Sequence, residues 1–126
     1  PWKAWRCKVA PLVRFLHYTS AGGSLPAHVD LSRTLRNGER TTHTFLLYLS
    51  ESDTGGETVL LSTREGDACL AHAGGVAPGE RKAIVSVSPR KGRLLITPHV
   101  CPHLAAATTA PKLVVRGELV VAPRYG

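Results

Sequence analysis

The segment LPAHVD, residues 25–30, places a histidine and an aspartate on either side of one valine. In an extended strand, residues i and i+2 point to the same face, so the side chains of His28 and Asp30 could converge on one point. An imidazole nitrogen and a carboxylate oxygen at one point can form part of a metal site. The same pair could equally be two polar side chains on a solvated strand face, and the pattern by itself does not decide between these interpretations.

A metal bound by His28 and Asp30 needs a third donor from elsewhere in the chain. The candidates are the remaining histidines: His17, His43, His72, His99 and His103. Two histidines and one carboxylate leave three positions of an octahedral metal open, which is the facial arrangement of non-haem Fe(II) sites. The open positions can accept a bidentate 2-oxoacid and dioxygen. A zinc site formed by Cys7 and the segment HVCPH (99–103) is an alternative, although its ligand spacing is irregular.

A dicarboxylate cosubstrate at such a metal also needs a basic residue for its far carboxylate. Lys112 stands nine residues after His103, at the start of the apolar run KLVVRGELVV. An unpaired charge inside a core is costly, so a lysine entering this run must find a partner. Alternatively, Lys112 extends its amino group into solvent at the end of the strand.

Short runs rich in branched and aromatic residues alternate with turn-forming segments such as SAGGS, RNGER and SPRKG. The runs predicted to be strands are residues 12–18, 43–50, 57–62, 83–88, 93–98 and 112–122. Residues 2–9, WKAWRCKV, are the one place where a short helix is credible, and residues 63–82 are predicted to be a long loop. The pattern predicts an all-β sandwich or barrel with little helix.

Composition limits the classes of protein to which the chain can belong. With 43% hydrophobic and 20% charged residues, the 126 residues are typical of a single globular domain. No apolar run approaches the roughly 20 residues of a membrane-spanning helix, and no signal-peptide pattern is present. The chain contains no methionine, so we interpret it as an excised domain. Its three widely spaced cysteines, Cys7, Cys69 and Cys101, favour an intracellular reducing compartment, although they leave the localisation itself open.

The chain is basic, with 16 lysines and arginines against 9 acidic residues and a net charge of +7. The surplus lies in turn-like stretches, where solvated loops are the plainer interpretation and an anionic partner such as nucleic acid is the alternative. No aromatic residues are interleaved with these charges as base-stacking platforms require, so the case for nucleic acid is weak.

Four stretches, in this order, resemble the prolyl 4-hydroxylase-type 2-oxoglutarate/Fe(II)-dependent dioxygenases: RFLHYTSAGGSLPAHVD, THTFLLYLSESDTGGETVLL, VSPRKGRLLITPHVCPHL and KLVVRGELV. The resemblance covers about residues 12–121, nearly the whole chain. It implies that residues 1–126 are one dioxygenase domain folded as a double-stranded β-helix, or jelly roll. One departure is that His103 is followed by Leu-Ala, where the family often has Glu-Gly.

The resemblance also assigns roles to individual residues. The iron ligands that it implies are His28, Asp30 and His103, and His99 matches a recurrent histidine that precedes the third ligand. The residues that it implies for binding 2-oxoglutarate are Lys112, Tyr48, Tyr18 and, as a second cation on the same strand face, Arg116. No catalytic residue beyond the metal ligands is implied.

The implied activity is hydroxylation of a substrate C–H bond with Fe(2+), 2-oxoglutarate and O2, giving succinate and CO2. Ascorbate (vitamin C) is a further candidate cofactor, and a peptide or protein, as in peptidyl-proline hydroxylation, is the expected substrate. Two alternatives remain, the same chemistry on nucleic acid and a non-catalytic jelly-roll binding module. The identity of the substrate and the oligomeric state cannot be deduced from the residues.

Overall fold

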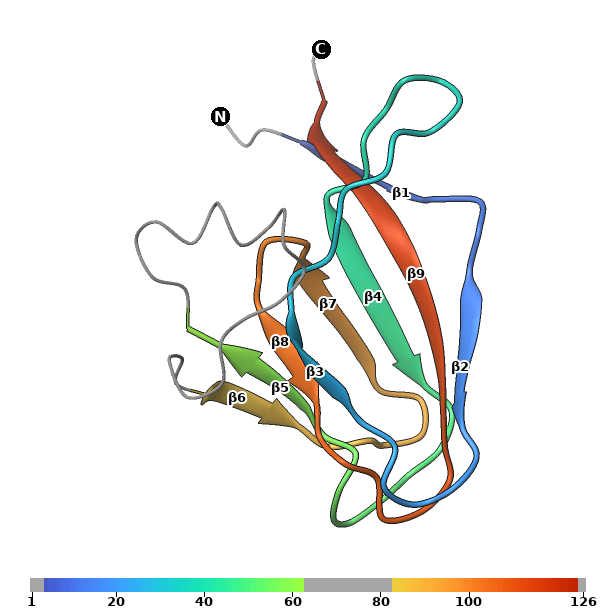
Figure 1. The fold of residues 1–126 in the computed structure, drawn as a ribbon. Coiled ribbons are helices and arrows are strands. Elements are labelled where there is room, and N and C mark those ends of the chain that lie inside the picture. Colours follow the sequence, from blue (N-terminus) through green and yellow to red (C-terminus); the bar gives the residue numbers. More distant parts are fainter. Residues whose placement is uncertain (1–3, 63–82, 125–126) are drawn as a thin grey trace.

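The computed structural model describes residues 4–62 and 83–124, and these residues form nine β-strands and no helix (Figure 1). In chain order the strands are β1 (Trp5–Val9), β2 (Arg14–Tyr18), β3 (Leu25–His28), β4 (His43–Tyr48), β5 (Thr58–Leu61), β6 (Ala83–Val87), β7 (Leu94–Pro98), β8 (His103–Ala105) and β9 (Lys112–Pro123). Accordingly, the described part of the chain offers no helix suited to crossing a membrane.

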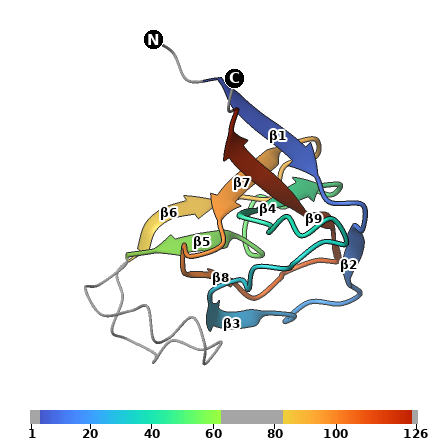
Figure 2. The same ribbon diagram turned by 90° about the horizontal axis from the view of Figure 1, so that it is seen from above.

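The strands form two antiparallel sheets. In the larger sheet, β9 pairs along one edge with β4 and along the other with β2 and then β1, while β7 pairs with the far edge of β4. The smaller sheet has the order β3-β8-β5-β6. Figures 1 and 2 show the smaller sheet lying against the part of the larger sheet formed by β2, β4, β7 and β9. Two facing antiparallel sheets with strands exchanged between them along the chain confirm the predicted jelly roll.

Side chains alternate between the two faces of the larger sheet, as they must in extended strands. Thr44 and Tyr48 on β4 and Lys112 and Val114 on β9 are buried, and their faces look toward the smaller sheet. On the opposite face, Phe15 is 69% exposed. The polar residues of the inner face are therefore enclosed between the sheets.

The six strands predicted from the sequence are all present, with small differences at their ends. β3 and β8 were not predicted, because each is very short and one contains a proline. The short helix considered for residues 2–9 was wrong, since residues 5–9 form β1. Arg6 and Lys8 both contact Glu39, so the side chains follow the period of two of a strand paired with β9. The predicted loop at 63–82 lies outside the described residues.

Candidate metal and cosubstrate site

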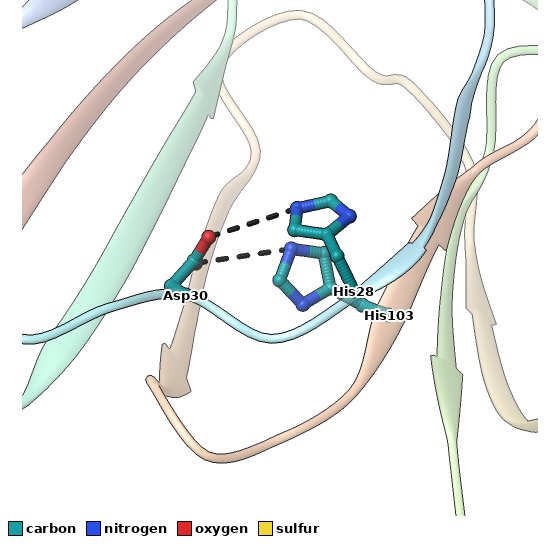
Figure 3. Close-up of side chains that lie close together, drawn as sticks. All are labelled: His28, Asp30 and His103. Atoms are coloured by element: carbon teal, nitrogen blue, oxygen red, sulfur yellow. Dashed lines mark ion pairs between the residues drawn. The ribbon is translucent and has the colours of Figure 1, made fainter. Parts of the chain in front are cut away.

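Two strands of the smaller sheet bring His28 and His103 side by side. His28 ends β3, His103 begins β8, and the two residues are register partners with ring centroids 4.4 Å apart. Asp30 lies two residues beyond the end of β3, where its backbone N–H donates to the carbonyl of His99 at 3.1 Å. One potential ligand atom from each of His28, Asp30 and His103 lies within 4.8 Å of the others. Figure 3 shows the three side chains close together.

Both imidazole rings have a fixed orientation. Nδ1 of His28 lies 2.8 Å from the carbonyl oxygen of Pro26, and Nδ1 of His103 lies 3.0 Å from that of Cys101. A carbonyl only accepts, so each Nδ1 carries the proton in the neutral ring and each Nε2 keeps its lone pair. Histidines that bind metals are commonly oriented in this way.

The two free lone pairs point at a carboxylate. Nε2 of His28 is 3.7 Å from Oδ1 of Asp30, and Nε2 of His103 is 3.8 Å from Oδ2 (Figure 3). With the proton of each ring on Nδ1, neither Nε2 atom can donate a hydrogen bond to the carboxylate of Asp30. The two nitrogens and the carboxylate are then three acceptors that face one another. A cation among them would satisfy all three, and two imidazoles with one carboxylate form a donor set that suits Fe(2+).

The Asp30 carboxylate is held ionised by its neighbours. Its side chain is 6% exposed, and this burial raises its pKa. A hydrogen bond of 2.6 Å from the hydroxyl of Thr44 to Oδ2, the nearby His103 and the guanidinium of Arg116, 3.1 Å from Oδ1, act in the opposite direction. Together they outweigh the burial and lower the pKa of Asp30.

Burial has the opposite consequence for His103, because it disfavours the charged ring. The side chain of His103 is 12% exposed, and desolvation lowers its pKa despite the nearby Asp30. A neutral ring keeps the Nε2 lone pair available for a metal.

A pocket extends from the two histidines between the sheets. The smaller sheet contributes His28, His103 and Thr58 to its lining, and the larger sheet contributes Tyr18, Lys112 and Arg116. Lys112 and Arg116 share one face of β9 but are four residues apart, which is about 13 Å of extended strand. The cavity therefore has two cations, and Arg116 is the one that lies beside Asp30.

Lys112 is 5% exposed. Its amino group donates to the carbonyl oxygen of Gly56 at 2.7 Å and lies 5.1 Å from the ring centroid of Tyr18 and 5.8 Å from that of Tyr48. Desolvation lowers its pKa, and the more distant Glu57 only partly offsets this. Within residues 4–62 and 83–124 it forms no ion pair, so a carboxylate entering the cavity would supply the missing partner.

Glycines shape the cavity around these side chains. Gly55 and Gly56 adopt φ values of 78° and 73°, which let the DTGGET turn present the Gly56 carbonyl to Lys112. A Cβ at Gly23 would lie 2.7 Å from the Tyr18 ring. The absence of side chains at these positions therefore leaves room for both residues to point into the cavity.

The other predicted residues are distributed as follows. Tyr48 is fully buried behind the cavity, where its hydroxyl lies 2.6 Å from that of Thr58. Cys7 is exposed on β1, and among the described residues the three-donor cluster does not include it, so the zinc alternative receives no support. His72 and Cys69 lie outside the described residues.

Sequence reasoning missed several polar residues around Asp30, chiefly Thr44, Glu118 and Arg33. Alternation along β4 could have placed Thr44 on the face of Tyr48, and alternation along β9 could have placed Glu118 on the face of Lys112. No local signal marks Arg33, which reaches Glu118 from the turn-rich segment between β3 and β4.

The fold resembles known proline hydroxylases. A prolyl-4-hydroxylase from Pseudomonas putida superposes with a TM-score of 0.55 and 21% identity, covering 84% of this chain and 50% of that one. The viral collagen prolyl hydroxylase of Paramecium bursaria Chlorella virus-1, solved in complex with 2-oxoglutarate, gives 0.54 and 13%, covering 98% and 62%. The chain thus spans only about half to three fifths of the length of these proteins.

Comparison at the level of sequence gives the family. No curated protein sequence is similar enough to count as a match. The model of the 2OG-Fe(II) oxygenase superfamily, however, matches residues 13–117, most of the described strands and the whole candidate site. The chain belongs to the 2OG-Fe(II) oxygenase superfamily.

Proposed function

We propose that this chain is the catalytic domain of a prolyl hydroxylase-like dioxygenase that uses Fe(2+), 2-oxoglutarate and O2. The observation that carries the proposal is the spatial arrangement of His28, Asp30 and His103 at one end of a cavity that also holds Lys112, which is buried and has no ion-pair partner among the described residues. Membership of the superfamily supports the same chemistry.

In this proposal Nε2 of His28, Nε2 of His103 and the carboxylate of Asp30 hold the iron. Bound iron(II) would supply the activation of dioxygen that couples oxidation of 2-oxoglutarate, to succinate and CO2, to hydroxylation of the substrate. The backbone carbonyls of Pro26 and Cys101 orient both rings with Nε2 toward Asp30, as a metal bound there would need.

Lys112 receives the distal carboxylate of 2-oxoglutarate. This cation is buried next to two tyrosine rings and has no ion-pair partner in the described part of the chain, so the dianion would supply its counter-charge and the contact would favour dicarboxylates. Tyr18 lines the cavity and packs against the same amino group, while Tyr48 supports it from behind. Arg116 is already paired with Asp30, so Lys112 is the better anchor of the two cations.

A peptide or protein is the proposed substrate, because both structural neighbours are prolyl hydroxylases by name. Ascorbate is proposed as the reductant that keeps the iron ferrous between turnovers. The competing substrate, nucleic acid, is supported only by the net charge of +7.

The metal site is tested by anaerobic addition of Fe(II) and 2-oxoglutarate, which should produce a weak visible charge-transfer band. His28→Ala and Asp30→Ala should abolish the band, while His17→Ala, a change of an exposed histidine on β2, should leave it intact. A band that survives in both ligand variants would show that the ligands are misassigned.

Turnover is tested by succinate formation with proline-containing peptides and with single-stranded oligonucleotides, each with and without ascorbate. Succinate coupled to hydroxyproline formation supports the proposal. Coupling to the oligonucleotides alone, with binding that weakens steeply as salt increases, would transfer the activity to nucleic acid. No coupled product with any substrate, in a protein that forms the band, would indicate a binding module.

A further inference from the structure

Both oxygens of Asp30 begin a chain of polar contacts, and both chains end at the same residue, Arg33. Arg33 belongs to a hairpin-like segment after β3, in which Thr34 and Arg40 form an isolated bridge. Its side chain is 36% exposed and lines an open groove at the surface. Eighty-five residues separate Arg33 from Glu118, its partner on β9.

The first chain consists of alternating charges. Oδ1 of Asp30 lies 3.1 Å from Arg116, whose other terminal nitrogen lies 3.7 Å from Oε1 of Glu118. Oε2 of Glu118 lies 3.0 Å from Nε of Arg33. Glu118 is 6% exposed, and its Oε2 is buried without an aligned hydrogen bond to any described residue. Arg33 is therefore the charge that compensates this oxygen.

The second chain consists of hydrogen bonds whose directions follow from the carboxylate. Because Oδ2 of Asp30 can only accept, Thr44 donates to it and must accept from Nδ1–H of His99 at 3.0 Å. Nε2 of His99 then accepts from the hydroxyl of Thr41 at 3.0 Å, and Thr41 accepts from the backbone N–H of Arg33 at 2.8 Å. The backbone of Arg33 is thus fixed by the same network that orients Asp30.

We propose that Arg33 is a positioning residue for the metal-binding carboxylate of Asp30, acting through Glu118 and Arg116. Arg33 draws Glu118 outward and so limits its pull on Arg116. Without Arg33, the buried carboxylate of Glu118 keeps Arg116 as its one cationic partner among the described residues, and Arg116 moves toward it and away from Asp30. This inference rests on the proposed function, because it assumes that Asp30 binds the metal.

Two explanations of how Arg33 affects the site predict opposite changes in metal affinity when Arg33 is removed. By charge alone, removing a cation near the site should strengthen the binding of a dication. If Arg33 acts by positioning, its loss should weaken metal binding, and changes to residues that support metal ligands typically cost about 10-fold or more in affinity. Arg36 is the matched control. It lines the same groove and forms no ion pair within residues 4–62 and 83–124, and its replacement by alanine removes the same charge.

The probe is Mn(II), titrated without oxygen chemistry and followed by the electron paramagnetic resonance signal of the free ion. We expect Arg33→Ala to bind Mn(II) about 10-fold more weakly. We expect Arg36→Ala to bind as well as the wild type or slightly better, and Arg33→Lys to recover part of the loss. Thermal unfolding of every variant verifies that the fold is intact.

A double variant tests whether Arg33 acts through Glu118. Glu118→Gln leaves the charge of Arg116 without an acidic partner other than Asp30 among the described residues, so it should weaken Mn(II) binding by itself. Because the glutamine no longer pulls on Arg116, adding Arg33→Ala in this background should cost little more. Additive losses, or an affinity for Arg33→Ala equal to that for Arg36→Ala, would overturn the positioning role while leaving the metal site standing. A wild-type protein that does not bind Mn(II) would overturn the metal site itself, and the positioning role with it.

Discussion

Replacing Thr44 with valine removes one hydroxyl from the inner face of β4 and keeps the branched shape of the side chain. Thr44 is 3% exposed, and its hydroxyl both donates to Asp30 at 2.6 Å and contacts Nδ1 of His99 at 3.0 Å. Thr97, its register partner on β7, is also buried at 8% exposure. Thr97→Val is therefore the matched control, because it removes an equivalent hydroxyl without affecting Asp30.

The size of the effect follows from the two contacts. A hydrogen bond to a charged group contributes about 1.5–3 kcal/mol, and a buried donor left without a partner costs about 1–3 kcal/mol. The imidazole of His99 can relieve the second cost by moving its proton to Nε2, which faces the hydroxyl of Thr41. We therefore expect Thr44→Val to lower the free energy of unfolding by about 2 kcal/mol near neutral pH.

The loss should depend on pH with a definite sign. The pKa of Asp30 is lowered in the folded state, so the stability that it contributes is present above its unfolded pKa and is lost as the pH falls through the folded pKa. Thr44→Val raises the folded pKa toward the unfolded value. The difference between wild type and variant should therefore be full at pH 7 and should shrink in acid.

Urea unfolding at pH 7 and at acidic pH, together with Mn(II) titration, measures these effects. We expect the Thr44 variant to bind Mn(II) about 10-fold more weakly and the Thr97 variant to bind it normally. If the two variants lose equal stability at pH 7 and bind the metal equally well, Thr44 does not hold the carboxylate and the reasoning fails.

Two further changes test the other end of the cavity. Lys112→Met should raise the Kd for 2-oxoglutarate, measured calorimetrically, by about 30-fold or more, which is 2 kcal/mol or more, and should leave Mn(II) affinity unchanged; equal affinity for the cosubstrate would contradict its role. Burial lowers the pKa of Lys112 in the folded state below 10.5, so between the folded pKa and 10.5 the unfolded chain binds more protons than the folded one. The free energy of unfolding of the wild type should therefore rise with pH in this window, and the methionine variant should lack the rise. Gly23→Ala should weaken 2-oxoglutarate binding, since its Cβ would lie 2.7 Å from the Tyr18 ring. Gly22→Ala, where a Cβ meets nothing within 4 Å but φ is 91°, should cost only stability, about 1 kcal/mol or more, and equal cosubstrate losses in both variants would count against the contact.

The sequence predicted the elements whose signals are local. Six strands carry enough branched residues to be recognised. The spacing of His28 and Asp30 allowed convergence without deciding it, and Asp30 in fact lies beyond the end of β3. β8 holds only three residues, so the position of His103 beside His28 depended on family resemblance and not on the pattern. The segment WRCKV is compatible with the periodicity of a helix and with that of a strand. It forms β1 because it pairs with an edge of β9, which is a tertiary contact.

The distribution of charge could not be predicted in the same way. Alternation along KLVVRGELVV places Lys112, Arg116 and Glu118 on one face, but it does not say which of them lies beside the proposed metal ligands. That depends on the register in which β9 pairs with β4 and on where the segment after β3 crosses them. Arg116 therefore looked like a second anchor for the cosubstrate, whereas it lies against Asp30.

If Asp30 binds iron as proposed, the order of these charges explains why a cation can lie beside a site that accepts another cation. Arg116 alone would repel an entering dication, since it lies 3.1 Å from the carboxylate that the metal needs. Glu118 offsets that charge, and Arg33 in turn compensates Glu118, so the formal charges of Asp30, Arg116, Glu118 and Arg33 alternate in sign from the site to the surface. The metal then meets a carboxylate that is fixed at both oxygens but whose neighbouring cation is already neutralised. An apolar residue at position 116 would remove the repulsion, but it would also leave Oδ1 of Asp30 without the partner that keeps the carboxylate in position.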